Sequence, residues 1–439
     1  MIENPLSFSL SVEGYFLEQR LKELIEYTET KLELEQYHLH TYQLKRKATI
    51  FKETIYTLGM EWLPPHKKER EEDGLNPKGT ASVEIDVHTR QLESVIFVGE
   101  KSFANGMTFQ RKDKEEVIQW LERETGLVYE KQFEILKEKE QEFLFQACID
   151  GVNVSPSGSM EVKFDEKGNL TFFSIGGYFP SKKNVKEETF TLKVNELEPF
   201  IMEQLKLIEF PFDEHHQLVP VYGIEEIYVT NDALETIPFE LFVERRYYDQ
   251  IDERLKWETP ILEPFEGAPI DWQEEVSMEQ VKTHEPHPDT LPITIAERNQ
   301  VIQSVETFMR KQFPSDSGKW VLKTIHRENG YILATLKHTT PNNRIFQRKL
   351  NVFLDSVSLQ VVNYLDNELL LATYEDFEAP GKITIQKEEA YEKIREEIEL
   401  TPVYVYDATS QQYILCGKID CPYGVHAATG EVFILDDLK

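Results

Sequence analysis

The sequence has few cysteines and no long apolar run, and each shortage narrows the classes of protein to which it can belong. Its three cysteines, Cys148, Cys416 and Cys421, are too few and too odd in number for a disulfide framework. No second pair completes a zinc site with Cys416 and Cys421, so we expect packed thiols. No stretch approaches the ~18–20 apolar residues of a membrane span. The first residues also lack the basic and apolar regions of a secretory signal, so the chain as it stands is expected to be cytoplasmic.

The sequence also has few basic residues relative to acidic ones. The 439 residues include 48 Lys and Arg against 79 Asp and Glu, which gives a formal net charge of -31. A field of that sign repels phosphate backbones and anionic lipid, so nucleic acid and membrane surfaces are not expected partners. The hydrophobic content of 40% supplies ample core. The length suits two to four domains of ~100–200 residues each.

The usual signatures of enzyme chemistry are missing. The sequence contains no glycine-rich phosphate loop, no His-Glu-x-x-His and no Gly-x-Ser-x-Gly. Pairs of carboxylates for acid–base work cannot be selected, because pairings among 79 acidic residues arise by accident. We therefore assign no catalytic, cofactor-binding or metal residue, and we expect no cofactor.

Histidines gather at two places in the sequence. The stretch 212–216 (FDEHH) contains His215 and His216, and the stretch 283–289 (THEPHPD) contains His284 and His287. Adjacent histidines point apart in any regular structure, so solvated loops are the favoured interpretation. A metal-assisted hydrolase that uses His215 or His284 with dispersed carboxylates stays open as the alternative. His88 and His426 lie in comparable hairpins, where turn histidines are expected.

Five segments have helical periodicity, and each is followed by a stretch in which apolar and polar residues alternate, as in a strand. Thr294 and Glu297 form a capping box at the fourth segment. The third helix is expected to end before Pro211 and the fifth at Pro402. The helices are expected to start near Val12, Asp113, Asn195, Thr294 and Gln386.

The spacing of these helices, ~80–100 residues, predicts an α+β protein of five tandem units, each with one helix packed on an antiparallel sheet. A segment rich in proline and acidic residues, Glu258–Pro292, is interpreted as an inter-domain linker that contains about one helical turn, and residues 276–292 are the linker between the third and fourth units. The five units are expected at residues 1–105, 106–186, 187–275, 293–380 and 381–439.

The closing hairpin, Tyr423–Val432 (YGVHAATGEV), has an echo upstream in Asp86–Leu92 (DVHTRQL). Counted from His426 and from Asp86, both copies have threonine at the fourth place and an aliphatic residue at the seventh. The order of helix, strands and closing hairpin resembles that of the PepSY-like, cystatin-like domains of the YcdB/YcdC repeat type of bacilli. That family ends on a strand, Asp-Ala-x-Thr-Gly-Glu-Val and a second strand. His426 stands where the family usually has Asp, and the Asp86 copy lacks the glycine. With the hairpin text of Gly151–Phe173, the resemblance touches three of the five units through short motifs.

The resemblance implies a binding role. PepSY domains are known from propeptides of thermolysin-like proteases, where they inhibit or assist folding, and from free-standing envelope proteins. No catalytic residues belong to the pattern. The favoured hypothesis is a non-catalytic binding or regulatory protein that engages a protease or another protein partner, and a structural spacer is a third hypothesis. We also expect Gly430 to take positive φ, and the last strand to pack on the fifth helix through Val432 and Phe433 or their alternates.

Overall fold

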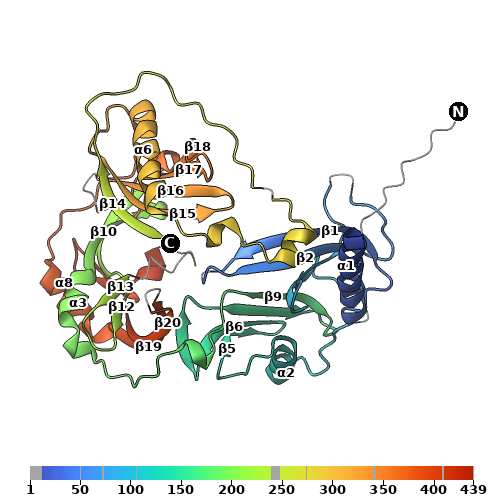
Figure 1. Ribbon diagram of the computed structural model, residues 1–439. Coiled ribbons are helices and arrows are strands. Elements are labelled where there is room, and N and C mark those ends of the chain that lie inside the picture. The colour runs from blue at the N-terminus through green and yellow to red at the C-terminus, as the bar shows by residue number, and fades with distance from the viewer. Residues whose placement is uncertain are drawn as a thin grey trace. The chain divides into compact units, whose positions relative to one another are not determined.

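The structure is a computed structural model that describes residues 12–49, 51–71, 74–104, 106–238, 248–272, 274–339, 343–407 and 410–438. The chain divides into two compact units, which Figure 1 shows with their elements labelled. Unit 1 consists of Met1–Asn153, Ser157–Lys182 and Glu274–His287. Unit 2 consists of Val154–Pro156, Lys183–Gln273 and Pro288–Lys439.

Unit 1 is an antiparallel sheet with helices packed against it. Its strands are β1 (His38–Ala48), β2 (Thr54–Leu63), β3 (Ala81–Asp86), β4 (Leu92–Phe97), β5 (Phe133–Lys139), β6 (Glu142–Ile149), β7 (Val152–Ser155), β8 (Ser159–Phe164) and β9 (Leu170–Gly176). They pair in the order β1-β2-β3-β4-β9-β8-β6, and both β5 and β7 also pair with β6. The helices of unit 1 are α1 (Val12–Lys31), α2 (Lys114–Thr125) and α5 (Met278–Thr283).

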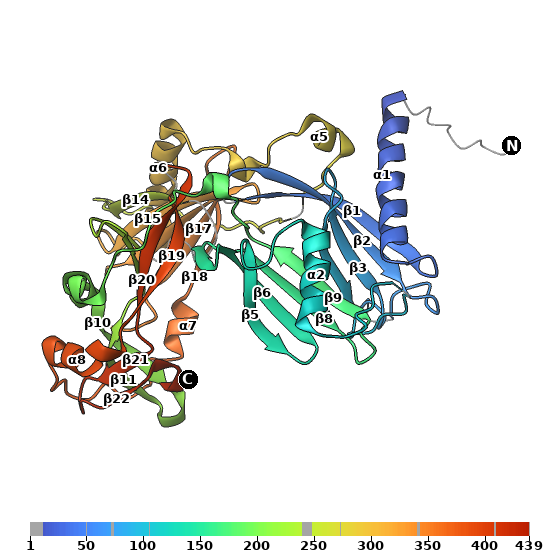
Figure 2. The ribbon, with the colours of Figure 1, turned by 90° about the horizontal axis from the view of Figure 1, so that it is seen from below.

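The core of unit 1 follows from the register of its sheet. Met60 is opposite Val83, Val83 is opposite Val95, and Val95 is opposite Phe173, so these side chains form a row on one face. Trp120 of α2 meets Phe173 edge-on, with ring centroids 5.0 Å apart. Buried residues of α1 and α2 belong to the same cluster as this row, so both helices cover the same face (Figure 2).

Unit 2 contains more strands and shorter helices. Its helices are α3 (Glu198–Gln204), α6 (Ile295–Gln312), α7 (Glu368–Ala372) and α8 (Lys387–Ile394). Its first strands are β10 (Leu205–Phe212), β11 (Gln217–Ile224), β12 (Ile227–Thr230), β13 (Thr236–Pro238) and β14 (Asp249–Leu255). The later strands are β15 (Trp320–Glu328), β16 (Tyr331–His338), β17 (Lys349–Asp355), β18 (Val361–Asp366), β19 (Glu399–Asp407), β20 (Gln412–Asp420), β21 (Tyr423–His426) and β22 (Val432–Ile434).

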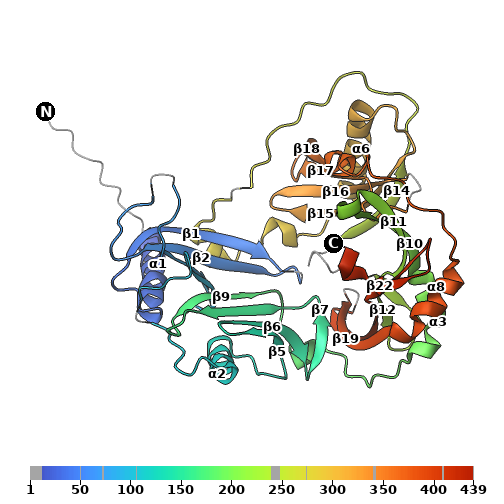
Figure 3. The ribbon, with the colours of Figure 1, turned by 180° about the vertical axis from the view of Figure 1, so that it is seen from behind.

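These strands pair in three groups, whose orders are β14-β15-β16-β17-β18, β10-β11-β21-β22 and β19-β20-β12-β13. Helix α6 covers the first group, where Val305 and Phe308 share a buried cluster with Leu322 and Val352 (Figure 3). Residues of α3 and α8 share a second cluster with β10, β11, β12 and β21. Helices α3, α6 and α8 therefore each contribute an apolar face to a sheet.

The prediction of tandem units, each with one helix on its own sheet, is wrong. Strand β4 pairs with β9, so segments 1–105 and 106–186 share one sheet. Strands β11 and β12 pair with β21 and β20, so strands of segments 187–275 and 381–439 form common sheets. Strands far outnumber helices in the described residues. Short meanders leave edge strands with unpaired N–H and C=O groups, and here other meanders supply the partners. The residue boundaries proposed for the five segments stay a prediction.

The helix starts are better predicted than the helix ends. Asp113 caps α2 by accepting from the Glu116 N–H at 2.9 Å, and Thr294 and Glu297 form the predicted capping box of α6. Helix α3 does end before Pro211, but already at Gln204, and Pro211 itself lies in β10. The expected end of the fifth helix at Pro402 is wrong, because α8 ends at Ile394 and Pro402 lies in β19. The N–H of Glu209 points away from β11, toward Asn343, and residue 211 has the same orientation. A proline there removes no bond between β10 and β11.

The closing hairpin forms, but its last strand packs differently from the expectation. Val425 of β21 is opposite Val432 of β22, and Gly430 has φ +75°, which confirms the predicted positive φ. Val432 and Ile434 are 39% and 42% exposed. Val425 of β21, rather than a β22 residue, lies in the buried cluster of α8. Val432 therefore does not pack on the fifth helix as expected, and Phe433 is half-buried but lies outside that cluster.

The segment rich in proline and acidic residues follows the surface of unit 2 before it reaches α5. The Ile261 N–H donates to the Arg310 carbonyl at 3.1 Å, and the Ala268 N–H donates to the Val362 carbonyl at 2.9 Å. Trp272 packs edge-on against Phe353, with ring centroids 5.7 Å apart. In the part of the chain that the structure describes, no helix is both long and apolar enough to cross a membrane.

Candidate functional site

A hollow of about 410 Å³ lies in unit 2, beside the connection between β16 and β17. Its walls come from the residues after α6, from the ends of β15 and β16, from the 344–348 connection, and from α7 and the residues that follow it. The lining residues are Phe313, Asp316, Trp320, His338, Arg344, Phe346, Gln347, Arg348, Glu368, Leu371 and Glu375. The walls thus combine aromatic rings with charged groups, as ligand pockets generally do.

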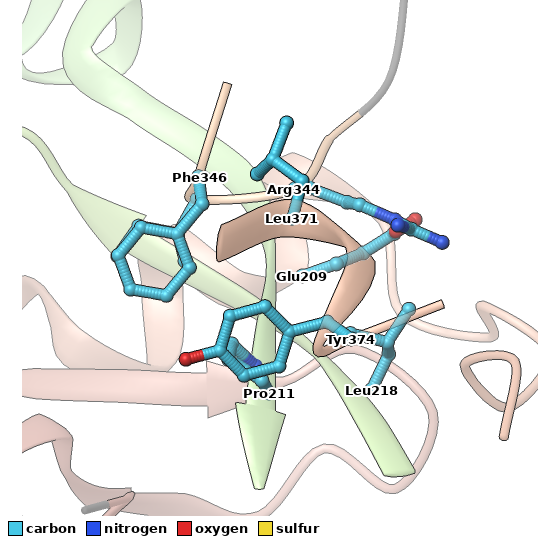
Figure 4. A pocket seen from close by; sticks show the side chains of 8 residues that line it. Glu209, Pro211, Leu218, Arg344, Phe346, Leu371 and Tyr374 are labelled. Carbon is cyan, nitrogen blue, oxygen red and sulfur yellow. The ribbon is translucent and has the colours of Figure 1, made fainter. Parts of the chain in front are cut away.

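An apolar depression adjoins the hollow and shares Arg344, Phe346 and Leu371 with it. Figure 4 shows the ring of Phe346 above that of Tyr374, with Pro211 and Leu218 of the β10–β11 hairpin behind them. The two rings stack with centroids 5.5 Å apart and planes at 13°. We call Phe346, Leu371 and Tyr374 the aromatic shelf.

Backbone hydrogen bonds hold the aromatic shelf in place. The Glu209 N–H donates to the Asn343 carbonyl at 2.7 Å, and the Ile345 N–H donates to the Glu209 carbonyl at 3.1 Å. The other strand of the hairpin is bonded too, because the Leu218 N–H donates to the Glu378 carbonyl at 3.0 Å. The connection 343–346 and the residues after α7 are therefore both anchored to the β10–β11 hairpin.

Ion pairs determine the electrostatics of the hollow. Arg348 contacts Asp366 at 2.7 Å and Glu368 at 2.6 Å, and its guanidinium lies 5.8 Å from the centre of the Trp320 ring. Burial acts to lower the pKa of Arg348, but the hydrogen bonds to these carboxylates outweigh it and raise the pKa. Burial lowers the pKa of His338, which also lines the hollow. Arg348 is therefore a fixed cation whose charge is already matched.

The acidic residue beside Trp320 is matched as well. Asp316 contacts Lys319 at 2.8 Å and accepts from the Trp320 indole at 3.3 Å. Burial acts to raise the pKa of Asp316, but the hydrogen bonds from Lys319 and Trp320 outweigh it and lower the pKa. Glu375 differs, because its carboxylate has no hydrogen-bond or ion-pair partner among the described residues.

The predicted histidine clusters are split between different neighbours. His215 packs against Phe212, with ring centroids 4.9 Å apart, and His216 packs against Phe377 at 4.2 Å. In unit 1, His287 is buried, and its backbone N–H donates to the Thr54 hydroxyl at 2.7 Å. Among the described residues, no group of three or more His, Cys, Asp or Glu side chains is arranged to hold a metal.

His284 and His88, which the sequence places in unrelated stretches, meet in unit 1. Their rings stack with centroids 4.5 Å apart and planes at 21°. Burial lowers the pKa of His88, and the neighbouring His284 lowers it further. Glu285, the residue after His284, contacts Arg46 of β1 at 3.1 Å. These contacts fix residues 284–287 against the sheet of unit 1, which is a packing role.

His426 lies in a six-residue turn that occurs three times in the described part of the chain, at 86–91, 355–360 and 426–431. In each copy the N–H of the fifth residue donates to the first carbonyl, at 2.9, 2.9 and 2.8 Å in chain order. The N–H of the first residue donates to the sixth carbonyl, at 2.9, 3.0 and 2.8 Å. The fifth residue has positive φ each time, +61°, +57° and +75°. The echo seen in the sequence is therefore a repeated backbone conformation.

Side chains complete the three turns in the same way. Asp86 accepts from the N–H groups of the third and fourth residues at 2.8 and 2.6 Å, and Asp355 does so at 3.3 and 2.7 Å. His426 takes the same role with its Nδ1, at 3.1 and 3.2 Å. Hydrogen bonds from Ser358 lower the pKa of Asp355. His426 thus replaces the aspartate as a turn acceptor.

The three cysteines are buried free thiols. Burial raises the pKa of Cys148 to about 11 and that of Cys416 to about 12, and it raises the pKa of Cys421 as well. A thiol with a raised pKa carries little thiolate, the form that attacks substrates or binds metals. Their environment is that of the packed thiols that the sequence predicts.

Sequence reasoning did not find the hollow. Its residues come from four separated segments, and no local pattern links Phe313 to Leu371. One signal was present in the run 344–349 (RIFQRK), which concentrates three basic residues and a phenylalanine in a strongly acidic chain. The turn at Asp355 was also missed, because its text (DSVSLQ) lacks the Thr-Gly of the closing hairpin.

No family model matches the sequence, and no curated protein matches it. Among solved structures, the chain is similar to the C-terminal domain of Bacillus megaterium YpeB. The two are 8% identical with a TM-score of 0.25, over 79% of this chain and 96% of that chain. A likeness at this level carries no argument about the fold or the role of this chain.

Proposed function

We propose that this chain is a non-catalytic binding protein that regulates a protein partner through the hollow and the aromatic shelf. We also propose that it is a distant relative of the PepSY-like proteins of the YcdB/YcdC type. The turns at Asp86 and His426, which carry the resemblance, support that relation. A protease is the class of partner that the resemblance implies, so it is the first class to test.

The observation that carries the proposal is the exposure of apolar side chains beside a hollow of protein-ligand size. Phe346 is 40% exposed and Leu370 of α7 is 51% exposed, although both adjoin Leu371. Contiguous apolar surface with a polar rim is typical of protein interaction sites. The charged groups of the hollow support binding over catalysis, because Arg348 and Asp316 are held in ion pairs.

The test is affinity capture from the native source with matched variants. Leu371→Asp places a charge in the aromatic shelf, and Leu234→Asp makes the same change at a leucine of unit 2 that is 76% exposed. We expect the parent chain and Leu234→Asp to recover the same partner, and Leu371→Asp to lose it. Recovery of the same proteins by all three chains would contradict the proposal.

A further inference from the structure

The charged side chains around the hollow differ in how completely they are paired with opposite charges. The terminal nitrogens of Arg348 contact Asp366 and Glu368, and the ammonium of Lys319 contacts Asp316. The Glu368 side chain nevertheless stays 65% exposed, and the exposed carboxylate of Glu375 has no partner among the described residues. The charge still available to a ligand from these groups is therefore negative.

Arg344 does not reverse that balance. Glu209 lines the same apolar depression and brings an equal and opposite charge, and Figure 4 shows both side chains on the same side of it. The backbone of Arg344 is fixed in the same place, because residues 343 and 345 both bond to Glu209. A ligand anion would have to compete with Asp366 and Glu368, which already contact Arg348.

The whole chain adds a field of the same sign. Its formal net charge of -31 attracts cationic segments and repels anionic ones. Complementary charge increases association rates and selects among partners, while buried apolar side chains supply most of the affinity. The aromatic shelf supplies such an apolar anchor beside Glu375.

We propose that the hollow binds a basic segment of a protein partner, in which a phenylalanine or leucine lies on the aromatic shelf and a neighbouring lysine or arginine faces Glu375 and Glu368. This inference rests on the proposed function, because it names the class of partner for the same site. Phe346 and Tyr374 give the apolar residue a flat surface. Glu375 stands at the edge of the hollow, where a long basic side chain reaches it while its head stays hydrated.

Fluorescence anisotropy with synthetic peptides tests the proposal on the full chain. The probe is a fluorescein-labelled peptide of repeated Lys-Phe-Lys-Leu. Matched probes carry glutamine for lysine, glutamate for lysine, or alanine for phenylalanine and leucine. We expect only the Lys-Phe-Lys-Leu probe to bind tightly. Its affinity should fall between ionic strengths of about 0.01 and 1 M, where the screening length shrinks from ~30 Å to ~3 Å.

Variants locate the binding on the chain. Phe346→Ala should weaken the Lys-Phe-Lys-Leu probe by about tenfold or more, as loss of an aromatic anchor does. Glu375→Gln should weaken it by about two- to fivefold and reduce its salt dependence, since exposed pairs contribute modestly. Glu399→Gln removes the same charge from an exposed position on β19 and should leave the affinity unchanged.

Each contrary result has a distinct meaning. Tighter binding of the glutamate probe would overturn the proposal in favour of an acidic partner. Equal binding of the glutamine and lysine probes would overturn the basic partner but leave the binding role of the aromatic shelf standing. Equal effects of Glu375→Gln and Glu399→Gln would reduce the charge preference to the net field and also overturn it. Binding of no probe would overturn it too, while capture by the parent chain but not by Leu371→Asp would still support the proposed function.

Discussion

Unit 1 and unit 2 are built from the same kinds of element, but they use the order of the chain differently. In unit 1, β1–β4 and β5–β9 are consecutive hairpins that join into one sheet through β4 and β9. In unit 2, β11 and β12 pair with β21 and β20, which come after the whole α6 segment. Repetition of local structure therefore does not require that each repeat folds on its own sheet.

The turn at Asp86 in unit 1 and the turn at His426 in unit 2 sharpen this comparison. Both have the same backbone hydrogen bonds, but one uses a carboxylate acceptor and an arginine at positive φ, and the other uses an imidazole and Gly430. The backbone conformation is thus kept while the side chains that stabilise it change. A short sequence echo reports this turn, and it does not report a domain.

The largest effect is expected from deleting residues 381–439. Independent units would leave residues 187–275 folded, whereas the pairing of β11 with β21 and β12 with β20 predicts that β10, β11 and β12 unfold. The deleted segment supplies about half of a buried cluster, including Ile394, Ile419 and Val425. At about 1.5–3 kcal/mol for each large apolar side chain, the loss is as large as the ~5–15 kcal/mol that stabilises a domain.

Hydrogen exchange measured by mass spectrometry checks this deletion. We expect protection to disappear at residues 217–230 and to persist in β1–β9 of unit 1. The full chain is the control. Native-like protection of residues 217–230 in the deleted chain would contradict the pairing that the structure assigns to unit 2.

The next largest effect is expected at Gly430. Its φ of +75° disfavours any residue with a Cβ, and a Cβ there would lie 3.0 Å from the Ile385 Cδ1 atom. Gly430→Val should therefore cost about 1–3 kcal/mol of unfolding free energy. Glu431→Gln, a change at the next position, should cost almost nothing. Thermal and urea unfolding of both variants measures the difference, and equal stability would show that the turn tolerates strain.

The two acceptors can be removed one at a time. Asp86→Ala leaves the N–H groups of His88 and Thr89 without their acceptor, and His426→Ala does the same to Ala428 and Thr429. We expect about 1–2 kcal/mol for Asp86→Ala, because a charged acceptor makes the stronger bonds. His426→Ala should cost about 0.5–1 kcal/mol. Faster exchange of these amides in each variant is the measurement, and unchanged exchange would remove the acceptor role.

The sequence predicted those features that a few neighbouring residues determine. Asp113 and Thr294 cap helices and Gly430 takes positive φ, because the groups that decide each feature lie within a few residues. The pairing of strands, in contrast, depends on residues that are far apart in the chain. Alternation shows which face of β3 is apolar, but no local pattern shows that Val221 of β11 is opposite His426. The tandem-unit prediction failed for this reason.

The candidate site could not be predicted from the sequence for the same physical reason. The aromatic shelf depends on bonds between Glu209 and residues 343 and 345, which lie far apart in the chain. Phe346 and Leu371 each have an ordinary local context, one in a connection and one in a five-residue helix. Only the long-range pairing brings them together beside the hollow, and local pattern carries no information about that pairing.

The smallest effect is expected where the two turns are made alike, by His426→Asp. The aspartate Oδ1 at Asp86 and the imidazole Nδ1 at His426 accept from equivalent N–H groups, so the replacement keeps both hydrogen bonds. A charged acceptor shortens and strengthens such bonds, but a carboxylate added to a chain of net charge -31 meets repulsion. These opposing terms predict a stability within about 0.5 kcal/mol of the parent, as for ordinary surface substitutions. Urea unfolding at low and at high salt separates them, because screening removes only the repulsion. A gain that appears at high salt would confirm the shared turn chemistry, and a loss of more than about 1 kcal/mol at both salts would show that the imidazole has a role beyond the two hydrogen bonds.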